Sequence, residues 1–193
     1  METGGTNLAA LSAPEEQLLL AQLRAGSREA FRTLYQRLLG RVLALCRRLL
    51  GDEQAAQDAT QEVFLRVFRS FHTFQGEARL ATWVFRIATN VCLTELARRS
   101  RRPQDLPGQD GAPQDDLEAP QPSPETLVTT DQLLALVEGL SPDKRAAFHL
   151  AFVEGLSAAE VGQVLGESRE TMLKRLQRLR IELAGRLCGG AAP

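Results

Sequence analysis

Residues that favour strands are scarce in this sequence. Its 193 residues include two Ile and ten Val against 32 Leu and 25 Ala, and only 5% are aromatic. Sheets favour β-branched and aromatic side chains, whereas Leu and Ala lose little side-chain freedom in a helix. The predicted fold class is therefore all-α.

Cysteine and histidine are also few. Cys46, Cys92 and Cys188 are odd in number, far apart and outside any C-x-x-C motif, so neither a disulfide framework nor a zinc site is indicated. His72 and His149 lie far apart, and the sequence has no G-x-S-x-G motif and no phosphate-binding loop. We therefore expect no enzyme activity, no catalytic residue, no metal site and no cofactor.

Long apolar segments are missing as well. No run approaches the roughly 20 residues that cross a bilayer, and the N-terminus has acidic Glu2 but no basic stretch of the kind that begins a signal peptide. We expect a cytoplasmic protein without membrane insertion, whose thiols are buried or idle in a reducing compartment.

The formal net charge of −1 conceals an uneven distribution. Residues 1–102 carry a net +5, residues 103–126 a net −6, and residues 127–193 are neutral. The acidic middle contains six of the nine prolines and no basic residue, which predicts an extended, flexible linker between two small helical domains. The predicted boundaries are a tail at 1–13, a domain at 14–102, the linker at 103–126, a domain at 127–187 and a tail at 188–193.

Capping residues and leucine spacing predict four helices in the N-terminal block. The capping box Ser12-Ala13-Pro14-Glu15 begins the first, and Ser27 and Asp52 cap the second and third. Apolar residues recur at spacings of three and four along each helix, which predicts a compact helical bundle. The expected extents are 12–26, 27–51, 52–71 and about 78–99.

The C-terminal block ends in a more diagnostic pair of helices. After helices predicted over 130–138 and beyond Ser141-Pro142, a second capping box at Ser157-Ala158-Ala159-Glu160 begins a short helix that Gly166 ends. A longer basic helix follows over 169–187. A short helix, a tight turn and a longer basic helix form the helix-turn-helix pattern, although helix pairs that bind proteins share the same outline.

Aromatic residues and arginines interleave around the third and fourth predicted helices. Six of the ten aromatic residues fall within 22 positions, and positions 66–102 contain eight arginines against two glutamates. This surface could stack on unpaired bases while neutralising phosphates, or a Phe-rich core could lie beneath a solvated arginine face. Helical spacing assigns Phe64, Phe68 and Phe71 to the core. Phe74, beside a break, and Trp83, off the inward stripe, fit either interpretation.

Asp58 and Glu62 lie four residues apart and therefore share one face of the third predicted helix. The spacing suits an acid–base or metal pair, yet no histidine is close and arginines follow at positions 66 and 69. An acidic, partner-binding edge is the favoured interpretation.

Three successive segments resemble a known family. The run Asp58-Ala59-Thr60-Gln61-Glu62-Val63-Phe64-Leu65-Arg66, then Phe74-Gln75-Gly76-Glu77, then Thr82 to Asn90 closely resemble the second conserved region of extracytoplasmic-function sigma factors in the bacterial sigma-70 family. Gly155-Leu156-Ser157 through Gly166, followed by Thr171 and Arg175-Leu176, resembles that family's fourth region, a helix-turn-helix. The resemblance extends from about Glu16 to Leu187, with both regions in family order.

The resemblance implies a sigma factor that binds core RNA polymerase and directs it to promoters. Its N-terminal domain is expected to bind the clamp helices of the β′ subunit, and the β flap and an anti-sigma factor are further expected partners. The polymerase contacts that the resemblance implies are Asp58, Gln61, Glu62 and Arg66.

The resemblance also assigns promoter contacts to both domains. The segment from Phe74 to Asn90 would melt the −10 element, leaving DNA partly single-stranded with one base flipped into a pocket, and the helix-turn-helix would contact the −35 element. Trp83 keeps a second interpretation as a structural anchor. The implied DNA contacts are Phe74, Gln75, Arg79, Trp83, Arg86, Asn90, Arg98 and Arg99 in the first domain and Arg169, Thr171, Lys174, Gln177 and Arg178 in the second.

Two positions depart from the family pattern. Glu170 occupies a position where Gly is common, and Leu173 a position that often bears a DNA-contacting cation. Either the upstream element differs from the usual one, or this neutral domain binds DNA weakly unless polymerase holds it in place.

Two other functions remain open from the sequence. One is a sigma-like regulatory protein that binds polymerase or an anti-sigma factor without opening promoters. The other is an ordinary helix-turn-helix repressor, which the motif at Asp58 to Glu62 disfavours.

Overall fold

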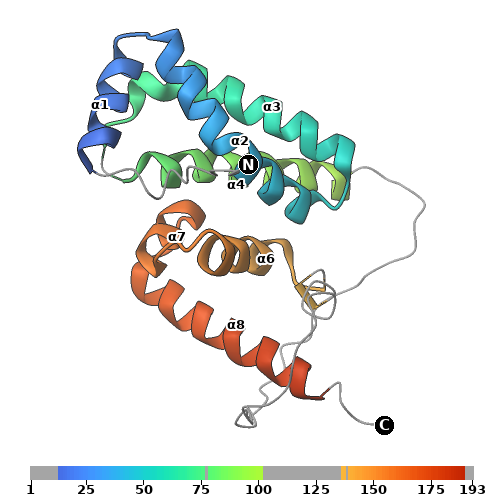
Figure 1. Ribbon diagram of the computed structural model, residues 1–193. Helices are drawn as coiled ribbons and strands as arrows, with labels where there is room; N and C mark the ends of the chain where they lie inside the picture. Colours follow the sequence, from blue (N-terminus) through green and yellow to red (C-terminus); the bar gives the residue numbers. More distant parts are fainter. Residues whose placement is uncertain (1–12, 77, 102–135, 138, 190–193) are drawn as a thin grey trace, which may run out of the picture.

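The computed structural model describes residues 13–76, 78–101, 136–137 and 139–189, and these form helices joined by short turns, without a strand (Figure 1). The predicted all-α fold class is confirmed. Ser12, Glu77, the linker at 103–126 and most of the helix predicted over 130–138 lie outside the described residues. The elements are α1 (Ala13–Arg24), α2 (Arg28–Leu50), α3 (Glu53–Ser70), the 3-10 turn η2 (Phe71–Thr73), α4 (Leu80–Arg101), α6 (Pro142–Phe148), the π-helical turn η3 (His149–Val153), α7 (Ala158–Leu165) and α8 (Arg169–Gly189).

The predicted caps place the helices of the N-terminal domain. Ser27 accepts a hydrogen bond from the Ala30 amide at 3.2 Å, and Asp52 accepts one from the Ala55 amide at 2.6 Å. Gly51 ends α2 in the left-handed conformation, at φ 66°, which glycine adopts without steric cost. The tight turn at Gly51 and Asp52 therefore turns the chain back so that α3 packs along α2.

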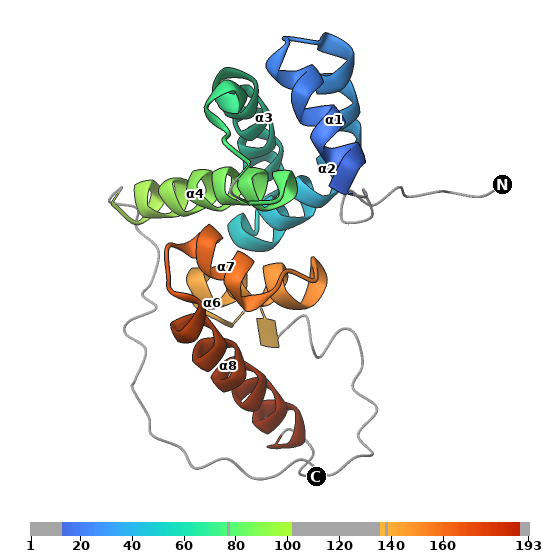
Figure 2. The same ribbon diagram turned by 90° about the vertical axis from the view of Figure 1, so that its left-hand side faces the viewer.

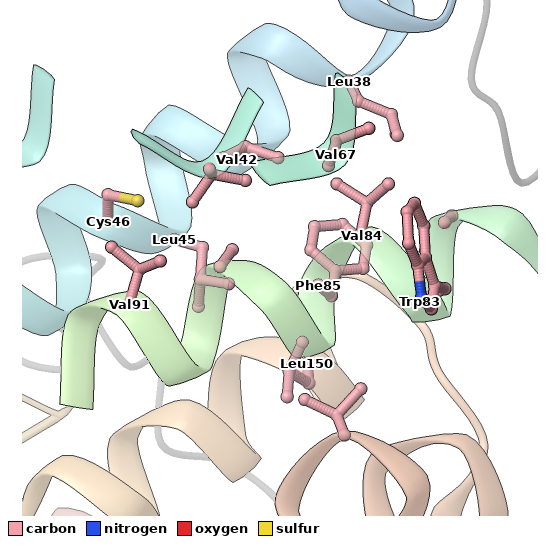
Figure 3. Packing of buried hydrophobic residues seen from close by; sticks show 14 of the residues in the cluster. Leu38, Val42, Leu45, Cys46, Val67, Trp83, Val84, Phe85, Val91 and Leu150 are labelled. Carbon is pink, nitrogen blue, oxygen red and sulfur yellow. The ribbon is translucent and has the colours of Figure 1, made fainter. Parts of the chain in front are cut away.

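A leucine-rich stripe on α2 forms the centre of the N-terminal core. Its residues pack between α3 and α4, where Val67, Val84 and Phe85 meet them (Figure 3). Phe64 is buried as its spacing predicts, but the assignment of Phe68 to the core is wrong, because its side chain is 53% exposed. The fully buried members of the α2 stripe are Leu34, Leu38, Val42, Leu45 and Leu49.

The C-terminal domain contains the predicted helix-turn-helix. Ser157 and Glu160 form the full capping box of α7, and Gly166 ends the helix at φ 74°. Gly162 lies where α7 crosses the following turn: a Cβ there would lie 2.6 Å from the Glu167 carbonyl oxygen. This close approach sets the angle at which α8 leaves α7.

The two domains pack against each other. α7 lies along α4, and α6 lies beside α2, in both views of the ribbon (Figures 1 and 2). One apolar cluster runs through both domains and includes Phe85 of α4 and Leu150 of η3, which face each other in Figure 3. Because α2 and α3 cover one side of α4 and α7 covers the other, more of this helix is buried than its own apolar stripe predicts.

Candidate functional site

The predicted polymerase-binding residues gather on one outward face of α3. Asp58, Gln61 and Arg66 are exposed and Glu62 is half-buried. Glu62 accepts a hydrogen bond from Arg66 at 2.7 Å, as expected for residues four apart on a helix. Asp58 accepts one from the Gln54 amide at 3.2 Å. The face thus presents acidic groups, of which Glu62 already has a cationic partner.

An apolar groove of about 470 Å³ lies beside this face, between α2 and α3. Gln61 belongs to both features, and the exposed Tyr35, Leu65 and Phe68 line the groove. Sequence reasoning missed the groove, although Phe31, Tyr35, Leu39 and Leu43 recur every four residues along α2 and form a second stripe beside the buried one. The other lining residues are Gln57, Thr60 and Phe64.

The segment predicted to melt DNA begins with a buried aromatic pair. Phe74 and Trp83 are only 6% and 7% exposed, and their ring centroids lie 5.2 Å apart. The Arg24 guanidinium of α1 donates a hydrogen bond to the Phe74 carbonyl oxygen at 2.8 Å. Glu16, also from α1, accepts a hydrogen bond from the Leu80 amide at the start of α4. Helix α1 therefore positions the loop on which Phe74 lies.

Polar side chains of α4 and of the loop before it are exposed. Gln75, Arg79, Arg86 and Asn90 are exposed. A second cavity, of about 300 Å³, is lined by Asn90 and Ile87 of α4 and by Arg66, Arg69 and Ser70 of α3. The structure thus places Arg66, predicted to bind polymerase, next to Asn90, predicted to bind DNA.

Two of the predicted phosphate contacts already have an acidic partner. Arg98 and Arg99 both donate hydrogen bonds to Glu95, at 2.8 and 3.0 Å. These hydrogen bonds lower the pKa of the Glu95 carboxyl to about 2. Phosphate would therefore compete with Glu95 for the same two guanidinium groups.

The predicted recognition helix presents a mixed surface. Arg169, Thr171, Lys174, Gln177 and Arg178 are all exposed on α8, while Met172 and Leu179 face the core. The two positions that depart from the family pattern are exposed as well, and Glu170 forms an ion pair with Lys174 at 3.1 Å. Ser168 caps the helix by accepting a hydrogen bond from the Thr171 amide at 3.2 Å.

An ion pair between the domains was not predicted from the sequence. Arg41 of α2 donates a hydrogen bond from Nε to Glu154 Oε2 at 2.6 Å, and Glu154 Oε1 lies 3.3 Å from Nε2 of the buried His149. Burial alone would raise the pKa of the Glu154 carboxyl, but the contacts with His149 and Arg41 outweigh this effect and lower it. Residues 113 positions apart in sequence give no local signal of such a contact.

Neither a metal cluster nor a membrane span is found in the part of the chain that the structure describes. No three His, Cys, Asp or Glu side chains there gather around a common point. None of the helices in that part combines the length and the hydropathy needed to cross a bilayer.

Comparisons with known proteins identify the family of this chain. The model for sigma-70 region 2 matches residues 34–102, and that for sigma-70 region 4 matches residues 130–183. RNA polymerase sigma-H factor of Pseudomonas aeruginosa is 31% identical over 185 residues, covering 88% of this chain and 92% of that protein. SigE of Mycolicibacterium smegmatis is 38% identical over 148 residues, covering 74% of this chain but 56% of that longer relative.

Solved structures share the fold. The sigma factor RpoE of Bartonella quintana, in complex with the anti-sigma factor NepR, is 22% identical with a TM-score of 0.63, over 84% of this chain and 98% of that one. CnrH in complex with the cytosolic domain of CnrY gives a TM-score of 0.64 at 22% identity, over 92% and 99%. Both region models match in order, and SigE is named as an ECF RNA polymerase sigma factor, so this chain belongs to the extracytoplasmic-function group of the sigma-70 family, whose members direct promoter-specific initiation by RNA polymerase.

Proposed function

We propose that the N-terminal domain binds the clamp helices of the polymerase β′ subunit through the outward face of α3. The observation that carries this proposal is that the face of α3 with Asp58 and Glu62 adjoins the apolar groove, and Gln61 belongs to both. Protein interfaces combine a buried apolar anchor with a polar rim that sets orientation. Asp58 and Gln61 would supply the rim, and Tyr35, Leu65 and Phe68 the anchor.

The first half of α4 and the loop before it would then contact the −10 element. The exposed Gln75, Arg86 and Asn90 can reach bases and phosphates, and the cavity beside Asn90 is a candidate place for part of a flipped nucleotide. Phe74 and Trp83 pack on each other in this state, so their first role here is to hold the loop in shape. Stacking of Phe74 on a flipped base would require that ring to leave Trp83.

Helix α8 would contact the −35 element with limited intrinsic affinity. Thr171, Lys174 and Arg178 share its outward face, but Lys174 is paired with Glu170 of the first turn. DNA affinity depends on the number of phosphates that cations neutralise. We therefore propose that contact with the β flap holds the domain in place. We further propose an anti-sigma factor as a partner, because the similar RpoE structure of Bartonella quintana contains the anti-sigma factor NepR.

Reconstituted transcription tests the proposal. Core polymerase and genomic promoter fragments from the same organism are incubated with or without the full chain, and transcript start sites are mapped. We expect discrete starts that require the chain. If polymerase retains the chain but no promoter is opened, the sigma-like regulatory protein considered above is the better description.

A further inference from the structure

We propose that Glu16 and Arg24 of α1 are positioning residues for recognition of the −10 element, because they hold the segment that carries Gln75 from both sides. Arg24 donates a hydrogen bond to the Phe74 carbonyl, next to Gln75, and Glu16 accepts one from the Leu80 amide. The inference rests on the proposed function, which assigns −10 contacts to Gln75 and to α4. Neither residue of α1 is expected to touch DNA.

Helix α1 is a rigid support for these two contacts. Leu19 and Leu23 are buried and belong to the same apolar cluster as Phe74, and the helix packs on α2 and on η2 (Figure 1). Glu16 and Arg24 are eight residues apart, about 12 Å along the axis and within roughly a quarter turn of each other. One anchored helix therefore fixes both contacts at once.

Glu16 meets a need of the start of α4. The first turn of α4, residues 80–83, consists of uncharged side chains. Backbone N–H groups at a helix start lack partners within the helix, and the positive end of the helix dipole favours a carboxylate there. Glu16, 64 positions earlier, supplies this carboxylate to the Leu80 amide. It thereby helps to fix where α4 begins and how Arg86 and Asn90 approach DNA.

The segment before α4 depends on Arg24 because its own backbone holds it weakly. The amides of Gln75 and Gly76 donate to no backbone carbonyl within the described part of the chain. Gly76 adopts the left-handed conformation at φ 85°, which for glycine is one of several accessible conformations. The hydrogen bond from Arg24 to the Phe74 carbonyl is 2.8 Å long, and such charge-assisted bonds are about twice as strong as neutral ones. Without it, Gln75 can take other positions.

Support of this kind acts on the choice between promoters rather than on polymerase binding. A side chain already held in the position that the native base requires binds that base without an ordering cost, whereas a loosely held one bears that cost and adapts to other bases as well. Loosening the segment should therefore lower the preference for the native −10 sequence. The face of α3 with Asp58 and Gln61 belongs to another helix, so polymerase retention should stay constant.

Trp83 gives a readout that needs neither DNA nor polymerase. It is the one tryptophan of the chain, and its ring packs on Phe74 with centroids 5.2 Å apart. The fluorescence of full-length Glu16→Ala and Arg24→Met is compared with that of wild type. We expect emission at longer wavelength and acrylamide quenching at least about twofold stronger, because the buried indole gains contact with water when the segment opens locally.

The second measurement is base preference. Holoenzyme with each full-length variant opens a promoter found by the reconstituted transcription above, and copies of that promoter with single substitutions in the −10 element. We expect the ratio of opening on the native to that on the substituted promoter to fall by about tenfold for Glu16→Ala and Arg24→Met, as for loss of one hydrogen bond to a charged group. Arg24→Lys, which keeps a charged donor, should recover part of the ratio. A loss of stability alone would lower opening on every promoter alike and leave the ratio unchanged.

Gln17→Ala and Arg28→Met are the matched controls. Gln17 is an exposed neighbour of Glu16 on α1, and Arg28 is an exposed arginine that begins α2. Both controls should match wild type in fluorescence and in base preference. If Glu16→Ala fails to fold by circular dichroism, Glu16→Gln takes its place and should change both readouts in the same direction by less, because it keeps an uncharged acceptor.

The outcomes separate this inference from the proposed function. Unchanged quenching of Trp83 in the folded variants, or an unchanged base preference, would overturn the inference while wild type still opens its promoter selectively. If wild type itself opens no promoter, or opens native and substituted promoters equally, the proposed function fails and −10 positioning fails with it. Quenching of Trp83 then still shows whether α1 holds this segment.

Discussion

Phe74 and Trp83 pack ring against ring, with centroids 5.2 Å apart, at the junction between η2 and α4. The pair lies beneath the loop that carries the predicted promoter-melting residues. A substitution there can act through stability, through DNA contact, or through both. Separating these effects requires two variants.

Phe74→Ala should lower the free energy of unfolding by about 3 kcal/mol, because it removes a buried ring. Phe74→Leu should retain most of that stability and lose only aromatic stacking. Denaturant unfolding measures the first effect, and permanganate footprinting of the melted bases the second. If Phe74→Leu melts promoters as wild type does, the ring has no role in stacking on a flipped base.

Asp58→Ala combined with Gln61→Ala should weaken retention by core polymerase by tenfold or more. Both side chains are exposed, so helicity should not change, and circular dichroism serves as the check. Glu29→Ala is the control, because Glu29 is an exposed acidic residue in the first turn of α2. Equal retention of the double variant and the control would remove this face of α3 from the interface.

Gly162→Ala should destabilise the C-terminal domain by about 1–3 kcal/mol and reduce promoter binding. The added Cβ would meet the Glu167 carbonyl oxygen at 2.6 Å and push α8 away from α7. Gly185→Ala is the matched control, because nothing lies within 4 Å of a Cβ there, and alanine should add up to about 1 kcal/mol of helix stability. Thermal unfolding of both variants would show opposite signs, and a silent Gly162→Ala would contradict the close approach.

Stability should depend on pH through Glu154. The pKa of its carboxyl is lowered: burial opposes the shift, and the contacts with His149 and Arg41 outweigh burial. A carboxyl with a lower pKa in the folded state stabilises above its ordinary pKa and loses that contribution as pH falls through the lowered value. The wild-type free energy of unfolding minus that of Glu154→Gln should therefore shrink between pH 5 and pH 3. A difference that stays flat over this range would show that the ion pair contributes nothing to stability.

Local signals in the sequence account for most of the secondary structure. Ser27, Asp52 and Ser157 cap the helices they were predicted to cap, because a cap depends on neighbours within four residues. Helical spacing likewise places Asp58 and Gln61 on one outward face. The partner expected to bind this face was inferred only from the resemblance to sigma factors.

Contacts between distant segments could not be predicted in this way. Phe85 is fully buried because a second domain covers the side of α4 opposite its own core. Phe68 is exposed because it lines the open groove between α2 and α3, where its ring meets Phe31 edge to face. Hydrophobic periodicity reports which face of a helix is buried but not which partner buries it. The Arg41–Glu154 pair joins two such segments and left no pattern in either.

The π-helical turn before Glu154 makes this contact sensitive to chain length. The Glu154 amide donates a hydrogen bond to the His149 carbonyl five residues back, at 2.9 Å, so the wider turn places both side chains on one side. A π turn holds one residue more than an α turn. Deleting a single residue between positions 149 and 153 would rewind it and rotate Glu154 by about 100°. Among relatives, a one-residue gap at this turn should therefore mark the chains that lack the ion pair between domains.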